Sequence, residues 1–284
     1  MTVDDFVDMH RRRLPVEVLC AAISHKRSTY YARKRRPGSS RTQRDHKLAK
    51  QIAAVRRGYN KARGRRTVVR ALRRKGISCS EKVVGRVMRE NGWFGAPRAR
   101  RQRPAIPVQI SHRDLVQRQF WASAPNQVWW GDVKEIQTRE GELFLSSLQD
   151  AYSRYIVGFA FSSNNDTNLT SSALARAVRN RKPGRGMIHH TDRGGPYTSW
   201  AYQAQLEQLG ALPSVSRPGV PHDNACIESW HSTLQREFLA FHRFETRDQA
   251  IREITGWIRH FNKHRFHSTL GYLSPVEHEA HNVA

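Results

Sequence analysis

The sequence predicts a mixed α/β domain, a five-stranded sheet with helices on both faces, preceded by an all-α basic region. Three observations predict it. Basic residues concentrate in the first 125 positions, three strand-like segments joined by short turns follow from residue 126 to 161, and helix and strand patterns then alternate to residue 261. A strand meander followed by the order αβαβα is typical of a two-sided α/β layer.

Charge divides the chain in two. The 284 residues carry a formal net charge of +25, with 49 Lys+Arg against 24 Asp+Glu. Residues 1–125 hold 32 basic and 8 acidic side chains, net +24, whereas residues 126–284 hold 17 and 16, net +1. A polyanion is therefore the expected partner of the N-terminal part.

Several classes of protein are excluded by composition. No run of ~18 apolar residues could span a membrane, and the N-terminus has no apolar signal-peptide core. We therefore expect a location in the bacterial cytosol or nucleoid. The three cysteines are isolated and lack CxxC spacing, so each is expected to be a small buried residue: Cys20, Cys79 and Cys226.

The basic region divides into three parts. Residues 1–40 are a basic helical segment with two short helices over 14–36, either a helix-turn-helix remnant or a plain basic hairpin. Residues 41–97 predict a helix-turn-helix DNA-binding domain. Residues 98–119 are rich in Arg and Pro and predict an extended tether. Arg100 and Arg101 in this tether are expected to contact DNA, with binding that weakens steeply with salt.

Three helices are expected in the second part. Leu48, Ile52 and Val55 mark the first, and a turn ending at Arg66 precedes the second, which Gly76 ends. Ser80 is the predicted N-cap of the third. The predicted buried sides of the last two helices are Val68, Val69, Leu72, Val83, Val84, Val87 and Met88.

Basic residues of this domain predict contacts to DNA phosphates. Lys82, Arg86 and Arg89 follow at steps of four and three, which places them on one edge of the third helix. Arg65 and Arg66, in the preceding turn, are expected to join them. The alternative is that these are solvated charges on a small three-helix bundle.

The core elements follow from periodicity. Strands are predicted at residues 126–137, 142–149, 154–161, 187–191 and 212–215. Asp166 or Thr167 is expected to cap a helix that passes through Val178, and further helices are predicted at residues 197–209, around Glu228 and at residues 247–261.

Three carboxylates are the candidate site. Asp132 and Asp192 are each expected where a strand ends, and Glu228 lies beside an apolar helical stripe of Ile227, Trp230, Leu234 and Phe238. The spacings are 59 and 35 intervening residues. Such acids can converge although they are remote along the chain. Without a nearby set of Cys or His at ligand spacing, they suit an oxygen-preferring cation such as Mg²⁺.

The core resembles the DDE transposase/integrase catalytic core, a ribonuclease-H-like fold. More closely, it is similar to the OrfB subunit of insertion-sequence-three family transposases over residues 120–280. The segments that carry the likeness are PNQVWWGDV, LQDAYSRYIVGFA, HHTDRGGPYTS, HDNACIESWHSTLQREF and FNKHRFHSTLGYLSP. The preceding RGRRTVVRALRRKGISCSEKVVGRVMRENG is similar to the family's helix-turn-helix.

The resemblance implies a function. Asp132, Asp192 and Glu228 would be the catalytic triad, holding two Mg²⁺ ions, with Mn²⁺ as a substitute. Water would first free a 3′-hydroxyl at an element end, and that hydroxyl would attack a second strand, through a circular intermediate. The implied partners are double-stranded DNA at terminal inverted repeats and at the target, further copies of the chain on DNA, and an upstream OrfA subunit or fusion.

The sequence departs from the family pattern at two places. A Lys or Arg is usual seven residues after the Glu, whereas position 235 is Gln and Arg236 lies beside it. Lys134 and Glu135 replace a Thr-aromatic pair after the first Asp. The first departure leaves open whether Arg236 is the substitute DNA contact.

Other polar residues have two interpretations. Asp150 is expected in a turn before Arg154, and Asp223 is expected to cap the Glu228 helix, although both are rival ligands. His189 and His190 could shuttle protons but are expected to be packed. The C-terminal motif residues either hold DNA or fasten the tail to the core: Asn262, Arg265 and His267.

Two other functions stay open at this stage. One is a non-catalytic regulator that binds element ends through residues 44–103. The other is a ribonuclease-H-type nuclease that cuts without joining.

Overall fold

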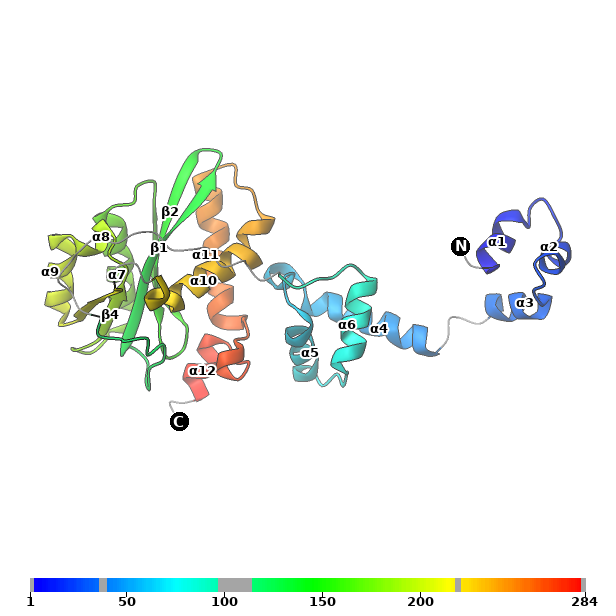
Figure 1. Cartoon of the computed structure of the whole chain (residues 1–284), viewed down its shortest axis with the longest axis horizontal. Coiled ribbons are helices and arrows are strands. Elements are labelled where there is room, and N and C mark those ends of the chain that lie inside the picture. The colour runs from blue at the N-terminus through cyan, green and yellow to red at the C-terminus, as the bar shows by residue number, and fades with distance from the viewer. Residues whose placement is uncertain (1–2, 36–39, 97–113, 218–220, 282–284) are drawn as a thin grey trace.

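The computed structural model describes residues 3–35, 40–96, 114–217 and 221–281. Along the chain, three small N-terminal helices precede a second helical group, and an α/β domain follows (Figure 1). The sequence did not predict the first helix, α1 (Val3–His10), whereas the last helix, α12 (Pro275–His281), lies in the core domain of residues 120–284, which was expected to end in a helical tail.

The N-terminal helices form a small bundle. In it, α1 packs with α2 (Val16–Ala22) and α3 (Arg27–Arg35) around a buried cluster of Val7, Leu19, Cys20 and Tyr30. The Tyr30 hydroxyl donates to Asp8 over 2.9 Å, which fixes α3 against α1.

The second helical group matches the expected three-helix domain. Its helices are α4 (Ser40–Val55), α5 (Arg65–Arg74) and α6 (Glu81–Glu90). Ser80 caps α6 as predicted, accepting from the Val83 amide. Two details were wrong: Arg65 and Arg66 open α5 rather than lying in a turn, and Val83 is exposed because it faces away from the cluster around Val84 and Leu72.

The α/β domain contains a sheet of five strands in the order β3-β2-β1-β4-β5. The long strands β1 (Val128–Thr138), β2 (Gly141–Asp150) and β3 (Ile156–Ser162) form the predicted antiparallel meander. The short strand β4 (Ile188–Thr191) pairs parallel with β1, and β5 (Leu212–Val215) pairs parallel with β4 at the edge of the sheet.

Helices cover both faces of the sheet, as predicted (Figure 1). One face carries α10 (Ala225–Glu237) and α11 (Arg247–His264), and the other carries α7 (Thr167–Arg181) and α9 (Trp200–Leu209). Trp129 and Trp130 are both fully buried, one in each core, because successive side chains of a strand point to opposite faces. Asp166 caps α7 by accepting from the Leu169 amide.

The predicted helix at residues 197–209 is interrupted. Residues Gly195–Thr198 form one short turn, α8, and α9 begins after Ser199, whose hydroxyl accepts from the Tyr202 amide. The sequence prediction missed this break because it followed apolar periodicity, and a single capping serine does not interrupt that pattern.

Part of the predicted tether belongs to the core. Val116 is buried among the residues that pack α10 and α11 onto the sheet, and the Leu115 amide donates to Ser214. Tether positions 98–113, Arg100 and Arg101 included, lie outside the described residues.

The helix-turn-helix domain contacts the C-terminal part of the core. Arg63 donates to the carbonyl of His264 over 3.1 Å, and Arg74 donates to Glu277 over 2.9 Å. The ring of Phe266 packs against the helical cluster, with the guanidinium carbons of Arg63 and Arg74 at 4.9 and 4.3 Å from its centre. Residues some 200 positions apart thereby fasten the two domains together.

Candidate active site

Asp132 lies in the middle of β1 and not at its end, which corrects the sequence prediction. Parallel pairing of β1 with β4 nevertheless stops at Gly131 and Thr191, so Asp132 is the first β1 residue beyond the end of β4. A side chain at Gly131 would come within 2.9 Å of the His189 ring, which explains the glycine before Asp132.

Asp192 follows the last residue of β4 and so lies beside Asp132 at the same sheet edge. Its Oδ1 accepts from the Gly194 amide over 2.9 Å. Burial raises the pKa of the Asp192 carboxyl most, and the negative charge of Asp132 raises it further. The hydrogen bond from the Gly194 amide lowers it. The two aspartates are thus close enough to repel each other.

The helix α10 is bonded to this pair through a histidine. His231 Nδ1 lies 3.1 Å from Asp132 Oδ2, and its Nε2 lies 3.0 Å from Ser147 Oγ on β2. A carboxylate can only accept, so Nδ1 carries the hydrogen and Nε2 accepts from the serine hydroxyl. His231 therefore fixes both the helix and the orientation of the Asp132 carboxylate.

Glu228 lies in the first turn of α10 and is exposed. Side chains three apart on a helix are neighbours, with about 5–6 Å between their Cβ atoms, so Glu228 lies on the helix face that carries His231. Across the described residues, no three or more His, Cys, Asp or Glu side chains gather closely enough to hold a metal ion. The structure thus brings Asp132 and Asp192 together and places Glu228 on the helix bonded to Asp132.

The two rival carboxylates have structural roles. Asp150 is fully buried and accepts from the amides of Asn126, Tyr152 and Ser153 over 2.7 to 3.1 Å, as a turn residue should. Burial raises its pKa, and these bonds lower it in part.

The predicted capping of α10 by Asp223 is wrong. The N-cap residue is Asn224, which makes no side-chain capping bond. Asp223 is instead buried and accepts from Arg217 over 2.8 Å and from Arg118 over 3.0 Å, and the bonds from Arg217 contribute most to holding its pKa far below the usual range. The guanidinium groups compete successfully for it because charged donors bind a carboxylate more strongly than backbone amides do.

Both histidines before Asp192 are packed. His189 Nε2 lies 2.8 Å from the Tyr202 hydroxyl, and His190 Nδ1 lies 2.8 Å from the Ser214 hydroxyl. Burial lowers the pKa of His189 to about 3 and of His190 to about 4, so both are neutral near pH 7.

The C-terminal motif fastens α11 to its surroundings. Asn262 accepts from the Ile156 amide over 2.9 Å and donates to the Ile156 carbonyl over 3.1 Å. Arg265 makes two bonds to Glu237, of 2.8 and 2.6 Å. The structure therefore gives Asn262 and Arg265 intramolecular partners.

The candidate DNA-binding side chains fall into two groups. Arg65 donates to Glu81 over 2.8 Å, and Arg86 is bonded to both Asp45 and Glu90, so carboxylates already occupy these guanidinium groups. Three others are exposed, although Arg66 lies 3.6 Å from Glu81: Arg66, Lys82 and Arg89.

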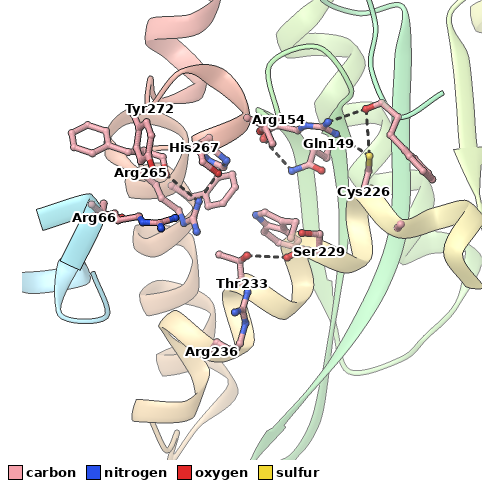
Figure 2. A pocket seen from close by; sticks show the side chains of 18 residues that line it. Arg66, Gln149, Arg154, Cys226, Ser229, Thr233, Arg236, Arg265, His267 and Tyr272 are labelled. Carbon is pink, nitrogen blue, oxygen red and sulfur yellow. Dashed lines mark hydrogen bonds between the residues drawn. The ribbon is translucent and has the colours of Figure 1, made fainter. Parts of the chain in front are cut away.

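Position 235 and its neighbour face different ways. Gln235 is exposed, on the side of α10 that carries Glu228. Arg236 donates to the carbonyl of Ser232 over 3.0 Å and borders a cavity on another side of α10 (Figure 2).

The sequence prediction did not identify two residues that lie near the site. His231 lies three positions after Glu228, and this helical spacing could have revealed it. Asn224 donates to the carbonyl of Gly131 over 3.2 Å, a contact across 93 positions for which the sequence carries no local signal.

The fold and the paired aspartates define a class: a ribonuclease-H-like catalytic domain with a helical DNA-binding domain. Family models agree, since residues 122–221 and 209–275 match "Integrase core domain" and residues 43–101 match "HTH-like domain". The chain belongs to the insertion-sequence-three family of transposases and is a DDE-type DNA transposase.

The membership depends on relatives of nearly full length. The chain is 37% identical over 251 residues to the transposase for insertion sequence element IS904 of Lactococcus lactis, covering 87% of this chain and 99% of the relative. It is 32% identical over 289 residues to the transposase InsF for insertion sequence IS3A of Escherichia coli, covering 98% and 99%.

A solved structure shares the fold. A chain of the simian T-cell lymphotropic virus intasome in complex with PP2A regulatory subunit B56 gamma superposes with a TM-score of 0.50 at 13% identity, covering 81% of this chain and 73% of that chain. Within the described part of the chain, no helix is long and apolar enough to cross a membrane.

Proposed function

We propose that Asp132, Asp192 and Glu228 are the catalytic residues of this transposase, and that they hold two Mg²⁺ ions, or Mn²⁺, to cleave element ends and join them to target DNA. The observation that carries the proposal is the pair of mutually repelling aspartates at the end of β4, with α10 hydrogen-bonded to Asp132 through His231.

The residues present fit a divalent cation. Carboxylate oxygens are the ligands that Mg²⁺ prefers, and a cation would relieve the repulsion that raises the pKa of Asp192. Bound Mg²⁺ activates an attacking oxygen and neutralises a leaving one. Glu228 completes the ligand set from the first turn of α10.

The protein's own residues orient the reaction. His231 bonds to Oδ2 of Asp132, the Val133 amide donates to Oδ1 of Asp132 over 2.8 Å, and the Gly194 amide donates to Oδ1 of Asp192. Each carboxylate is thereby held in a fixed orientation before substrate arrives, which lowers the cost of ordering the site.

The helix-turn-helix domain supplies DNA affinity. Lys82 and Arg89 lie exposed on α6, and Arg66 lies exposed at the start of α5. We expect them to contact phosphates of a terminal repeat, with Arg100 and Arg101 as further contacts. Arg65, Arg86 and Arg265 contribute less, since each is already bonded to a carboxylate.

The acting form is an assembly on DNA in the bacterial cytosol. The expected partners are the terminal inverted repeats, the target duplex, further copies of this chain, and an upstream OrfA subunit or a fusion to it.

End cleavage and joining in vitro test the triad. The substrate is a duplex carrying the sequence that flanks the gene, and the variants are Asp132→Asn, Asp192→Asn and Glu228→Gln. Each variant is expected to lose more of both activities than the roughly 10–100-fold typical when a residue that only orients a metal ligand is replaced. Glu142→Gln, an exposed acid at the start of β2, is the control and should behave as wild type.

Each outcome has a distinct meaning. Activity retained in any one of the three variants removes that residue from the triad. Efficient cleavage by the wild type with no joined product would indicate a nuclease of ribonuclease-H type.

A further inference from the structure

A cavity of about 690 Å³ lies between the helix-turn-helix domain and the catalytic core. Its walls come from the start of α5, from one side of α10 and from the segment after α11 (Figure 2). The cavity is open to solvent and borders Ser229, the residue next to Glu228.

The lining is strongly positive. Four guanidinium groups border the cavity, and its described lining residues include no Asp or Glu: Arg66, Arg154, Arg236 and Arg265. From outside the lining, Glu237 bonds to Arg265 and Glu81 lies 3.6 Å from Arg66, so four arginines face these two nearby acids. Arg154 is held rigidly by bonds to the Phe120 carbonyl and the Cys226 sulfur.

His267 adds a buried hydrogen-bond donor. Its Nδ1 lies 3.5 Å from an Arg265 nitrogen, and because a guanidinium can only donate, Nδ1 accepts and Nε2 carries the hydrogen. That Nε2 is buried and has no hydrogen-bond partner among the described residues. An unsatisfied donor beside arginines suits an anionic acceptor.

The first turn of α5 also favours an anion. Arg66 and Thr67, the second and third residues of this ten-residue helix, border the cavity. The first amides of a helix lack intrahelical acceptors, and the N-terminus carries a partial positive charge. The N-cap is Gly64, which has no side chain to satisfy them.

The side of α10 that borders the cavity differs from the catalytic side. Ser229, Thr233 and Arg236 follow at steps of four and three, about 80–140° around the helix from Glu228 and farther still from His231. A group in the cavity is therefore adjacent to the triad without occupying it.

We propose that this cavity binds a phosphate of the DNA backbone and so holds one strand between α5 and α10, beside Glu228. The inference rests on the function proposed above, because the ligand is the substrate of that reaction. It adds a site formed jointly by the two domains, which couples DNA bound by the helix-turn-helix to the catalytic helix.

Salt dependence of binding tests the proposal. Affinity for a fluorescent 30-base-pair duplex is measured between roughly 50 and 200 mM salt in EDTA, so that no chemistry occurs. The slope of log affinity against log salt is negative, and Arg66→Gln and Arg236→Gln are each expected to make it less steep by about 0.9. Arg139→Gln, which removes an equally exposed charge from the β1–β2 turn, should leave the slope unchanged.

Two outcomes overturn the proposal. One is a pair of cavity variants with slopes equal to that of Arg139→Gln. The other concerns inorganic phosphate alone. If phosphate raises the unfolding midpoint of the wild type but not of the double cavity variant, and the salt slopes of DNA binding are unchanged, the cavity binds a free anion and not DNA.

The triad can fail separately. Its test reads cleavage in Mg²⁺, whereas this test reads binding without metal. If Asp132→Asn remains active while the cavity variants show the expected weaker salt dependence of DNA binding, only the triad assignment is lost.

Discussion

His231 on α10 bridges Asp132 on β1 and Ser147 on β2, with Nδ1 3.1 Å from Asp132 Oδ2 and Nε2 3.0 Å from Ser147 Oγ. His231 and Ser147 are buried and Asp132 is partly exposed, and the geometry of the bridge sets the tautomer of the ring. Because it orients a proposed ligand, its removal should affect the reaction more than DNA binding.

We predict that His231→Ala slows end cleavage by about 10–100-fold with little change in DNA affinity, the range typical of residues that orient metal ligands. His231→Gln, which can still donate to Asp132, should recover part of the rate. Ser147→Ala should cost less, and its effect should largely vanish in the His231→Ala background. Additive losses in the double variant would argue against the bridge.

Phe266 joins the two domains. Its ring packs on the helical cluster between Arg63 and Arg74. We predict that Phe266→Ala separates unfolding of the helix-turn-helix domain from that of the core, so that calorimetry resolves two transitions. The matched control is Phe94→Ala. Phe94 is an exposed aromatic of the helix-turn-helix domain, and its replacement should leave the transitions unchanged. A single unaltered transition in Phe266→Ala would contradict the docking role.

Asn262 satisfies both backbone groups of Ile156. Removing a partner from a buried polar group costs about 1–3 kcal/mol, so Asn262→Ala is expected to lower the free energy of unfolding by roughly 2–4 kcal/mol. Urea denaturation measures it. Lys263→Ala, the exposed neighbour on α11, is the control and should change stability by less than about 0.5 kcal/mol. An Asn262→Ala cost within that limit would mean that water replaces the side chain.

His189 makes stability depend on pH. Burial lowers its pKa in the folded state from 6.5 to about 3, so between these values the unfolded chain binds the proton and the folded chain does not. Its contribution is complete above pH 6.5 and is lost as pH falls towards 3, by at most about 1.4 kcal/mol per pH unit.

Replacing this histidine should remove that dependence. In urea titrations at pH 7, 6 and 5, His189→Gln is expected to start less stable than wild type and to lose less stability on acidification. His281→Gln, at an exposed position, should follow wild type. Parallel curves for wild type and His189→Gln would show that other groups govern the acid response.

The sequence by itself determined much of the local structure and the candidate acids of the site. Strand and helix positions were predictable because periodicity and capping act within a few residues, as at Ser80 and Asp166. The candidate acids were predictable because few side chains suit Mg²⁺, and the family motifs were present in order. The same local rules failed at Ser199, where a cap divides one predicted helix.

Only the tertiary structure decided which charged groups bind each other. Asp223 could cap α10 from sequence alone, but folding brings Arg118 to it from 105 positions away. Arg86 likewise bonds to Asp45 across 41 positions, and Phe266 reaches the helix-turn-helix domain. The physical reason is that these pairings depend on where elements pack in space, and no periodicity along a single element encodes that.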